Sequence, residues 1–360
     1  MKWRGGFPHL TNMVLGYAMD YREVLVTGGT GFVGTHVCRA LIARGFLPRL
    51  LVREGSEGRI PADVRSACRV TPGDITNRES VEYAVQGTMA VVHLVGIIRE
   101  SPRQDVTFER LHVDATRNVV DAARRWEVSR LIHMSALGAG ARPVKPAGYF
   151  DTKGRAEELV RQSGIPWTIF RPSVIFGPGD QFLGELAGIL RIAPVVPVPG
   201  DGSYRLQPVF IGDVAKGFTD ALLSSGTEGK VFEVGGPERF SYNELLDKVA
   251  ASVGRRARKV HVPLSLLRPV VSRLQRYRGF PLTTDQLEML LGESICDPDP
   301  FYSAFGFTPL SLSDYLSGGL GTLPSSPGSA SKKSASGNGR FMGGETDGSK
   351  EQDPPLRKTA

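Results

Sequence analysis

A tyrosine and a lysine stand four residues apart in this chain, at Tyr149 and Lys153. Apolar residues recur at helical spacing over residues 149–163, so both side chains would share one face of a helix. A lysine ammonium near a phenol favours the phenolate and lowers the pKa of the tyrosine from about 10. Such a tyrosine can act as a general acid or base when hydride moves to or from a neighbouring carbonyl carbon. Because the pairing also arises by chance, the surrounding elements must support it; its place after an expected strand ending at Met134 does so.

A glycine-rich loop separates an expected strand, residues 23–27, from an expected helix, residues 33–44, and reads Thr27-Gly28-Gly29-Thr30-Gly31-Phe32-Val33-Gly34. A dinucleotide pyrophosphate binds at a helix N-terminus where backbone N–H groups can approach it without side chains in the way. In this pattern Gly28 makes the turn, Gly31 lets the backbone approach the phosphates, and Gly34 lets helix and strand pack closely. Because a strand and a helix flank the loop, it predicts dinucleotide binding in preference to an unliganded tight turn.

The end of the second expected strand, residues 47–53, bears on the choice of cofactor. In an NAD site a carboxylate about 20 residues past the glycines holds the ribose 2′-hydroxyl. Here Arg53 stands nineteen residues after Gly34 and would instead pair with a 2′-phosphate. The sequence therefore favours NADP(H) over NAD(H). Two alternatives stay open: Glu54 follows directly, so a one-residue shift of the strand end reverses the preference, and Arg53 could be a solvated strand-end charge.

Strands and helices alternate through the first half of the chain. The apolar pattern predicts strands over 23–27, 47–53, 68–71, 90–95, 130–134 and 168–171, and helices over 33–44, 78–86, 108–125 and 149–163. This alternation indicates βαβ crossovers, hence an α/β fold with a Rossmann-type, doubly wound parallel sheet. Beyond residue 172 we expect a smaller C-terminal α/β substrate-side domain, with strands over 206–211 and 230–234 and helices over 241–253 and 284–291.

Composition sets the domain boundaries and excludes several classes of protein. We expect a poorly ordered N-terminus over 1–21, an NAD(P)-binding domain over 22–172, the substrate-side domain over 173–317 and a disordered tail over 318–360, in which 20 of 43 residues are Gly, Ser or Pro. Met13 or Met19 is an alternative start. Three distant cysteines without a C-x-x-C motif indicate no disulfide framework or zinc site, and they fit a reducing compartment. Without a secretory signal or a run of about 18 apolar residues, we expect a cytoplasmic protein.

The chain's positive charge gathers in one segment, Arg255–Arg278, which has eight lysines or arginines and no acid, against a net charge of +7 for the whole chain. Leucines and valines between residues 264 and 274 would form one apolar helical face, although Pro269 would kink the helix. Two interpretations stay open. The segment lies on an anionic membrane surface, at the inner face of the membrane, or it packs by its apolar face and leaves solvated arginines. Nucleic acid is not expected, because the interleaved aromatic residues are missing.

Taken together, these features resemble the extended and atypical short-chain dehydrogenase/reductase superfamily, which includes NAD-dependent epimerases and dehydratases. Three stretches resemble the branch of the nucleotide-binding accessory subunit of respiratory complex I and its bacterial relatives: residues 93–100 (HLVGIIRE), 133–139 (HMSALGA) and 171–180 (RPSVIFGPGD). The resemblance implies that the glycine loop, including Thr27, Phe32 and Val33, holds the pyrophosphate. It further implies contacts to adenine from Asp74 and Ile75, to the adenosine ribose from Val95 and Gly96, to the nicotinamide ribose from Lys153, and to the nicotinamide from Pro172, Ser173 and Val174.

The sequence departs from active members of that superfamily at two places. Active members carry a catalytic Ser or Thr just after the fifth strand, where this chain has Ser135 followed by Ala136 and Leu137; Ser135 is the candidate substitute, or a structural hydroxyl. His112 stands where many members have an asparagine that supports a proton relay.

Three functions therefore remain open. The first, favoured, is an NADP(H)-dependent oxidoreductase or epimerase-type enzyme with an unknown small-molecule substrate, linked to quinone or respiratory-complex function. The second is an NADPH-binding accessory or assembly protein of a membrane complex. The third is a nucleotide-sugar epimerase or dehydratase, with Asp180, Arg205 and Asp213 as polar candidates for its pocket.

Overall fold

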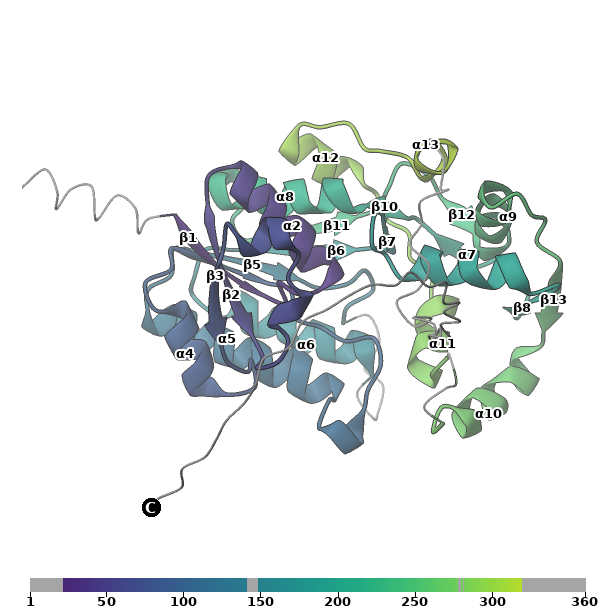
Figure 1. Ribbon diagram of the computed structural model, residues 1–360, viewed down its shortest axis with the longest axis horizontal. Coiled ribbons are helices and arrows are strands. Elements are labelled where there is room, and N and C mark those ends of the chain that lie inside the picture. The colour runs from purple at the N-terminus through teal and green to yellow at the C-terminus, as the bar shows by residue number, and fades with distance from the viewer. Residues whose placement is uncertain (1–21, 141–147, 278–279, 281, 319–360) are drawn as a thin grey trace, which may run out of the picture. The chain divides into compact units, whose positions relative to one another are not determined.

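A computed structural model describes residues 22–140, 148–277, 280 and 282–318. Seven parallel strands form the central sheet, in the order β11-β6-β5-β4-β1-β2-β3 (Figure 1). Their bounds are β1 Glu23–Thr27, β2 Leu47–Val52, β3 Arg69–Pro72, β4 Ala90–His93, β5 Arg130–Met134, β6 Trp167–Pro172 and β11 Lys230–Val234. The order reverses direction between β1 and β4, which confirms the doubly wound α/β class.

Helices cover both faces of this sheet (Figure 1). On one face, α2 and α8 pack against the side chains of β1 that point to that face, Val24 and Val26. On the other face, α4, α5 and α6 pack around Leu25, Val91 and Leu131. The bounds are α2 Phe32–Ala43, α3 Ala62–Arg65, α4 Arg78–Val85, α5 Ala115–Arg125, α6 Tyr149–Arg161 and α8 Ile211–Leu223, with short 3₁₀ turns η1 Glu57–Arg59, η2 Pro102–Gln104 and η4 Ser225–Thr227.

The helix expected over residues 108–125 is not regular throughout. Its first part, η3 (Glu109–Asp114), is a π-helix that runs directly into α5. A π-helical turn widens the helix by one residue and occurs frequently at functional sites. The apolar spacing does not distinguish the two forms, which is why the sequence predicted one continuous helix.

In the second half of the described chain, Phe301 and Phe305 join the core of the central sheet, and most of the other small sheets and helices surround a second core. That core contains Phe176, Leu186, Leu206 and Leu245. The elements are β7 Ile175–Phe176, α7 Phe182–Ile192, β8 Val196–Pro199, β9 Arg205–Leu206, β10 Val209–Phe210, β12 Phe240–Ser241, α9 Tyr242–Ser252, β13 Lys259–Val262, α10 Leu264–Leu274, α11 Thr284–Leu291, α12 Asp299–Phe305 and α13 Leu312–Ser317.

The prediction of one strand over residues 206–211 was wrong. The chain instead forms two short strands, β9 and β10, which pair with different partners, β12 and β7. Gln207 and Pro208 separate them; the proline carries no N–H to continue a ladder. By contrast, β11 returns to the edge of the central sheet beside β6, in parallel register. The boundary between residues 172 and 173 stays a prediction, and the expected disordered segments, residues 1–21 and nearly all of 318–360, lie outside the described residues.

Candidate functional site

The glycine loop between β1 and α2 is shaped for an anion. Gly28 has a φ of +76°, and a Cβ there would lie 3.2 Å from the backbone of Leu94 and Val95, in the loop after the neighbouring strand β4. A Cβ on Gly34 would collide with the Gly28 carbonyl. Helix α2 begins with Gly31 as its N-cap, without a side-chain cap and without an acidic residue in its first turn. Backbone N–H groups at this helix N-terminus therefore face no competing side chain, and the cradle fits a dinucleotide pyrophosphate.

The residues expected at the adenosine end lie on the loops after β2 and β3. Arg53 directly follows β2 and is exposed, as is Glu54. Asp74 Oδ1 accepts hydrogen bonds from the N–H and the hydroxyl of Thr76, each at 2.8 Å. The carbonyl of Ile75 accepts from Asn118 Nδ2 at 3.1 Å, which ties this loop to α5.

Lys153 of α6 points under the loop that follows β4. The residue is 2% exposed, and its Nζ donates to the Met134 carbonyl at 3.0 Å. A Cβ on Gly96 would lie 3.0 Å from Nζ, so the glycine leaves room for the ammonium. Burial lowers the pKa of Lys153 from 10.5 to about 8, and the charge of Glu157 opposes this shift.

Tyr149, at the start of α6, does not show the lowered pKa that we expected. Burial raises the pKa of its phenol from 10.0 to about 12, and Lys153 does not offset the shift. The tyrosine ring packs edge-on against Phe108 and His112, at centroid distances of 5.8 and 5.4 Å. Burial disfavours the charged phenolate, so the neutral phenol is favoured.

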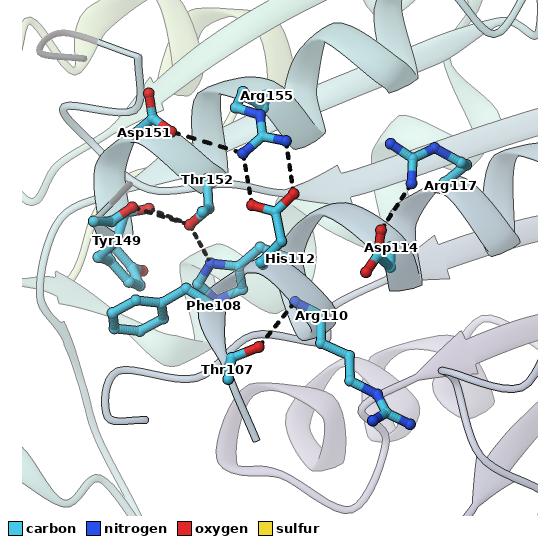
Figure 2. A network of polar contacts seen from close by, with 12 residues as sticks. Thr107, Phe108, Arg110, His112, Asp114, Arg117, Tyr149, Asp151, Thr152 and Arg155 are labelled. Atoms are coloured by element: carbon cyan, nitrogen blue, oxygen red, sulfur yellow. Dashed lines mark hydrogen bonds and ion pairs between the residues drawn. The ribbon is translucent and has the colours of Figure 1, made fainter. Parts of the chain in front are cut away.

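His112 joins the π-helix to the start of α6, as Figure 2 shows. Its Nε2 accepts from the Ile97 N–H at 3.1 Å, so the neutral ring carries its proton on Nδ1 and donates to Thr152 Oγ1 at 2.9 Å. The Thr152 hydroxyl in turn donates to the carbonyl of Gly148 or Tyr149. Burial, followed by the charge of Lys153, lowers the pKa of His112 from 6.5 to about 2, so this tautomer persists at neutral pH.

The same polar chain continues to the glycine loop. Thr116 Oγ1 donates to the His112 carbonyl at 2.5 Å, so it accepts from His93 Nε2 at 3.0 Å. His93 Nδ1 then accepts from the Thr27 hydroxyl at 2.6 Å. Thr27 ends β1, beside the pyrophosphate cradle. Two series of hydrogen bonds, joined by the covalent frame of His112, therefore connect the cradle to the helix that carries Tyr149.

Known proteins resemble this chain in sequence. An NAD(P)H-binding family matches residues 28–179. The 40 kDa subunit of mitochondrial NADH-ubiquinone oxidoreductase from Neurospora crassa is 26% identical over 318 residues, covering 87% of this chain and 82% of that subunit. Ceramide reductase from Caulobacter vibrioides is 30% identical over 252 residues, covering 68% of this chain and 75% of the reductase. This chain belongs to the extended short-chain dehydrogenase/reductase family.

Among solved structures, UDP-glucose 4-epimerase from Thermotoga maritima has a TM-score of 0.62 at 21% identity, covering 82% of this chain and 96% of the epimerase. That likeness shows the fold. The relatives include complex I subunits, in agreement with the resemblance seen in the sequence. As a short-chain dehydrogenase/reductase, the protein is an NAD(P)-binding, oxidoreductase-like protein.

Ser135, the candidate catalytic hydroxyl of this short-chain dehydrogenase/reductase, is the least complete part of the site. Ser135 is 3% exposed, and its Oγ has no hydrogen-bond partner among the described residues. It lies toward Glu157 without good hydrogen-bond geometry. Burial raises the pKa of that carboxyl, but Arg171 and then Ser135 outweigh the burial and lower it overall. Ala136 and Leu137, which follow, are buried.

The segment expected to contact the nicotinamide follows β6. The Pro172 carbonyl accepts from the Leu137 N–H at 3.0 Å, and the Val174 carbonyl accepts from the Val209 N–H at 2.9 Å. Ser173 Oγ donates to the Ser294 carbonyl at 2.8 Å. These bonds fix the segment between the central sheet and the second half of the chain.

Of the three polar candidates for a sugar-nucleotide pocket, Asp180 and Asp213 are buried and Arg205 is exposed, and each has a polar partner in the fold. Asp180 accepts from the N–H groups of Gly177 and Leu183, Asp213 accepts from the Leu310 N–H, and Arg205 pairs with Glu293 at 2.8 Å. Each of the three charged groups therefore already has a partner, so they do not support that pocket.

Sequence reasoning missed the roles of His93, Thr116 and Thr152. His93 ends an otherwise apolar strand, and Thr27 lies in register with it on the adjacent β1. A polar residue at the carboxyl end of an apolar strand was therefore the signal that could have identified this part of the network.

Proposed function

We propose that this protein is an NADP(H)-dependent reductase of a carbonyl substrate, with Tyr149 as the proton donor. The observation that carries the proposal is the placement of Lys153. Its buried ammonium lies beside Gly96, in the loop after β4. Lys153 is on the same helix as Tyr149, and the loop after β4 lies at the same edge of the sheet as the glycine cradle.

The chain's own residues divide the work. The loop from Thr27 to Gly34 would hold the pyrophosphate, Val95 and Gly96 the adenosine ribose, Lys153 the nicotinamide ribose, and residues 172–174 the nicotinamide. When bound, the dinucleotide supplies the hydride. A carbonyl oxygen that gains negative charge needs a proton, and the Tyr149 phenol, with a pKa of about 12, holds one at neutral pH. The protonated phenol is the form that reduction of a carbonyl requires.

The preference for NADP(H) rests on Arg53. It directly follows β2 and is exposed, as the guanidinium that pairs with a 2′-phosphate must be. Asp74, in the loop after β3, is a candidate carboxylate for the ribose 2′-hydroxyl of NAD(H), but its Oδ1 already accepts two hydrogen bonds from Thr76. Glu54 is exposed as well, so the ratio of the two dissociation constants is the quantity to measure.

Substrate chemistry is proposed from a relative whose name states its activity. Because ceramide reductase is 30% identical to this chain, we propose a long-chain carbonyl as the substrate class. Apolar Ala136 and Leu137 at the position of the usual hydroxyl suit an apolar substrate. NADPH oxidation by the purified protein should be followed with a long-chain ketone, with short-chain quinones and with sugar nucleotides.

Tyr149→Phe is the decisive variant, because it keeps the ring contacts with Phe108 and His112 while it removes the proton. We expect NADPH binding to be unchanged and turnover to fall about 100-fold or more. Equal turnover by both proteins would refute the role of Tyr149. NADPH affinity measured on both proteins separates loss of chemistry from loss of the site.

A second function is favoured by one observation, the unpartnered and buried Ser135 Oγ. If neither protein oxidises NADPH with any substrate class but both bind it tightly, the protein holds the nucleotide as an accessory or assembly subunit of a membrane complex. A nucleotide-sugar epimerase is less well supported, since Asp180, Arg205 and Asp213 are already engaged.

We also propose a peripheral membrane location. One relative is a subunit of mitochondrial NADH-ubiquinone oxidoreductase. In the part of the chain that the structure describes, every helix is too short or too polar to cross a bilayer. The basic segment from residue 255 onward is the candidate contact.

A further inference from the structure

Exposed apolar side chains gather at one end of the described structure. Among the described residues, eleven large apolar side chains are strongly exposed, and eight of them lie between residues 189 and 277. One of the eight, Leu223, ends α8, and the other seven form this group. They come from the end of α7, the approach to β8, strand β13, helix α10 and the turn after it. These elements are neighbours, because β13 pairs with β8 and α10 follows β13 directly (Figure 1). The seven residues are Ile189, Ile192, Val195, Val260, Leu266, Val270 and Tyr277.

Helix α10 has one face buried and one face open. Val271 is its only fully buried residue, and Arg268 pairs with Glu288 of α11. Leu266 and Val270 are one helical turn apart, turned away from Val271, and are 63% and 48% exposed. A helix that shows leucine and valine to the solvent, while packed by its other face, has an apolar surface without a partner.

Charge surrounds this apolar surface. Three arginines precede β13 and two lie at the end of α10, and all five are exposed. Within residues 22–140, 148–277 and 282–318, none of the five forms an ion pair, whereas the neighbouring Lys259 pairs with Asp247. The alternative seen in the sequence, a helix packed by its apolar face with solvated arginines, is met only in part: Val271 is buried, but Leu266 and Val270 stay exposed. The five arginines are Arg255, Arg256, Arg258, Arg273 and Arg276.

We infer that this end, which we call the α10 face (residues 255–258, 260, 266, 270, 273, 276 and 277), docks on an anionic lipid bilayer. The inference rests on the proposed peripheral location and names its partner. Apolar side chains flanked by arginines match the boundary between acyl chains and phosphate headgroups. Tyr277, 67% exposed, adds an aromatic ring with a polar tip, which suits the headgroup level of a membrane. A protein partner would need acidic side chains facing all five arginines together with an apolar patch. An anionic bilayer provides negative charge in its headgroups and an apolar phase in its acyl chains.

The experiment is co-sedimentation of the full chain with vesicles of phosphatidylcholine alone or with about 30% phosphatidylglycerol, at low and high salt. We expect binding to the anionic vesicles only, weakened by salt. Each arginine near an anionic surface strengthens binding by about fivefold, so Arg255→Gln, Arg256→Gln and Arg258→Gln together should weaken it about 100-fold. Leu266→Ser with Val270→Ser should weaken binding by about tenfold or more.

A matched control removes three exposed arginines elsewhere, by Arg65→Gln, Arg103→Gln and Arg124→Gln. It carries the same net charge as the test variant and should bind nearly as well as the unmodified protein. Equal losses in both variants would mean that net charge alone acts, and this would overturn the α10 face. Binding to natural membranes but not to protein-free anionic vesicles would overturn the lipid partner in favour of a membrane protein. NADPH affinity, measured on each variant, reports the nucleotide site separately, so failure of one proposal is distinguishable from failure of the other.

Discussion

Acid should destabilise this protein more steeply than its small number of histidines suggests. His93, His112 and His133 are each 1% exposed. Burial lowers the pKa of all three from 6.5, to about 3 for His93, to about 2 for His112 and well below the usual value for His133; the charge of Lys153 acts in the same direction. The folded protein therefore keeps three neutral imidazoles at pH values where the unfolded chain is protonated.

The sign and size follow from proton linkage. Below pH 6.5 the unfolded state binds up to three more protons than the folded state, so the free energy of unfolding falls as the pH falls. One histidine contributes a little over about 1 kcal/mol for each pH unit below its unfolded pKa. Lowering the pH from about 7.5 to about 5.5 should therefore cost about 4 kcal/mol for the three together, a large share of the roughly 5–15 kcal/mol that stabilises a typical domain.

Urea unfolding at these two pH values measures this loss, and His133→Leu isolates one third of it. Both ring nitrogens of His133 are buried without a hydrogen-bond partner among the described residues, so leucine removes no bond that the structure shows. The variant should keep or gain stability at the higher pH, because an unpaired buried polar group is costly, and should lose about 1 kcal/mol less on acidification. The same acid loss in both proteins would refute the reasoning for His133, and stability independent of pH would refute it for all three.

Three further predictions concern the cofactor and the sheet. Gly34→Ala should weaken dinucleotide binding about 100-fold or more, since its Cβ collides with the Gly28 carbonyl; isothermal titration with NADPH checks this, and unchanged affinity contradicts the cradle. Arg53→Asp should shift the ratio of the NADPH and NADH dissociation constants toward NADH, and an unaltered ratio would remove Arg53 from the site. Glu23→Gln should lower the free energy of unfolding by about 3 kcal/mol, because Glu23 is buried and pairs with Arg49 at 2.7 Å; a loss below about 1 kcal/mol in urea unfolding would show that the pair is dispensable.

Most of the sheet could be predicted from the sequence because its strands are short, apolar and separated by helices. The expected strands over 23–27, 130–134 and 230–234 have the observed bounds. The prediction of a strand failed where the apolar pattern is continuous but the strand pairing changes. The apolar run over 206–211 satisfies the pattern for one strand, but Pro208 and a change of pairing partner divide it.

The individual candidate residues of the site could be predicted from the sequence, but the hydrogen bonds that connect them could not. Tyr149 and Lys153 are four residues apart, so local helical geometry already places them together. The link from His93 through Thr116 to His112 spans segments far apart in the sequence, and it depends on strand order and on a π-helical turn. Neither of these is encoded in the spacing of apolar residues.

The pKa of Tyr149 could not be predicted from the sequence either, because it depends on the surroundings of the phenol in the fold. A lysine at i+4 was expected to lower it, but that expectation treats the two groups alone. In the fold, the ammonium of Lys153 donates to the Met134 carbonyl, while the phenol packs against Phe108 and His112. Burial therefore decides the shift, and the sequence contains no direct measure of it.

The two proposals meet near the start of helix α11. Arg99, in the loop after β4, donates to the Phe280 carbonyl at 2.9 Å. In the first turn of α11, Asp285 lies beside Gly148, where a Cβ would be 3.6 Å from its carboxylate, and Gly148 directly precedes Tyr149. The chain that follows the proposed bilayer contact therefore touches two segments that border the proposed proton donor.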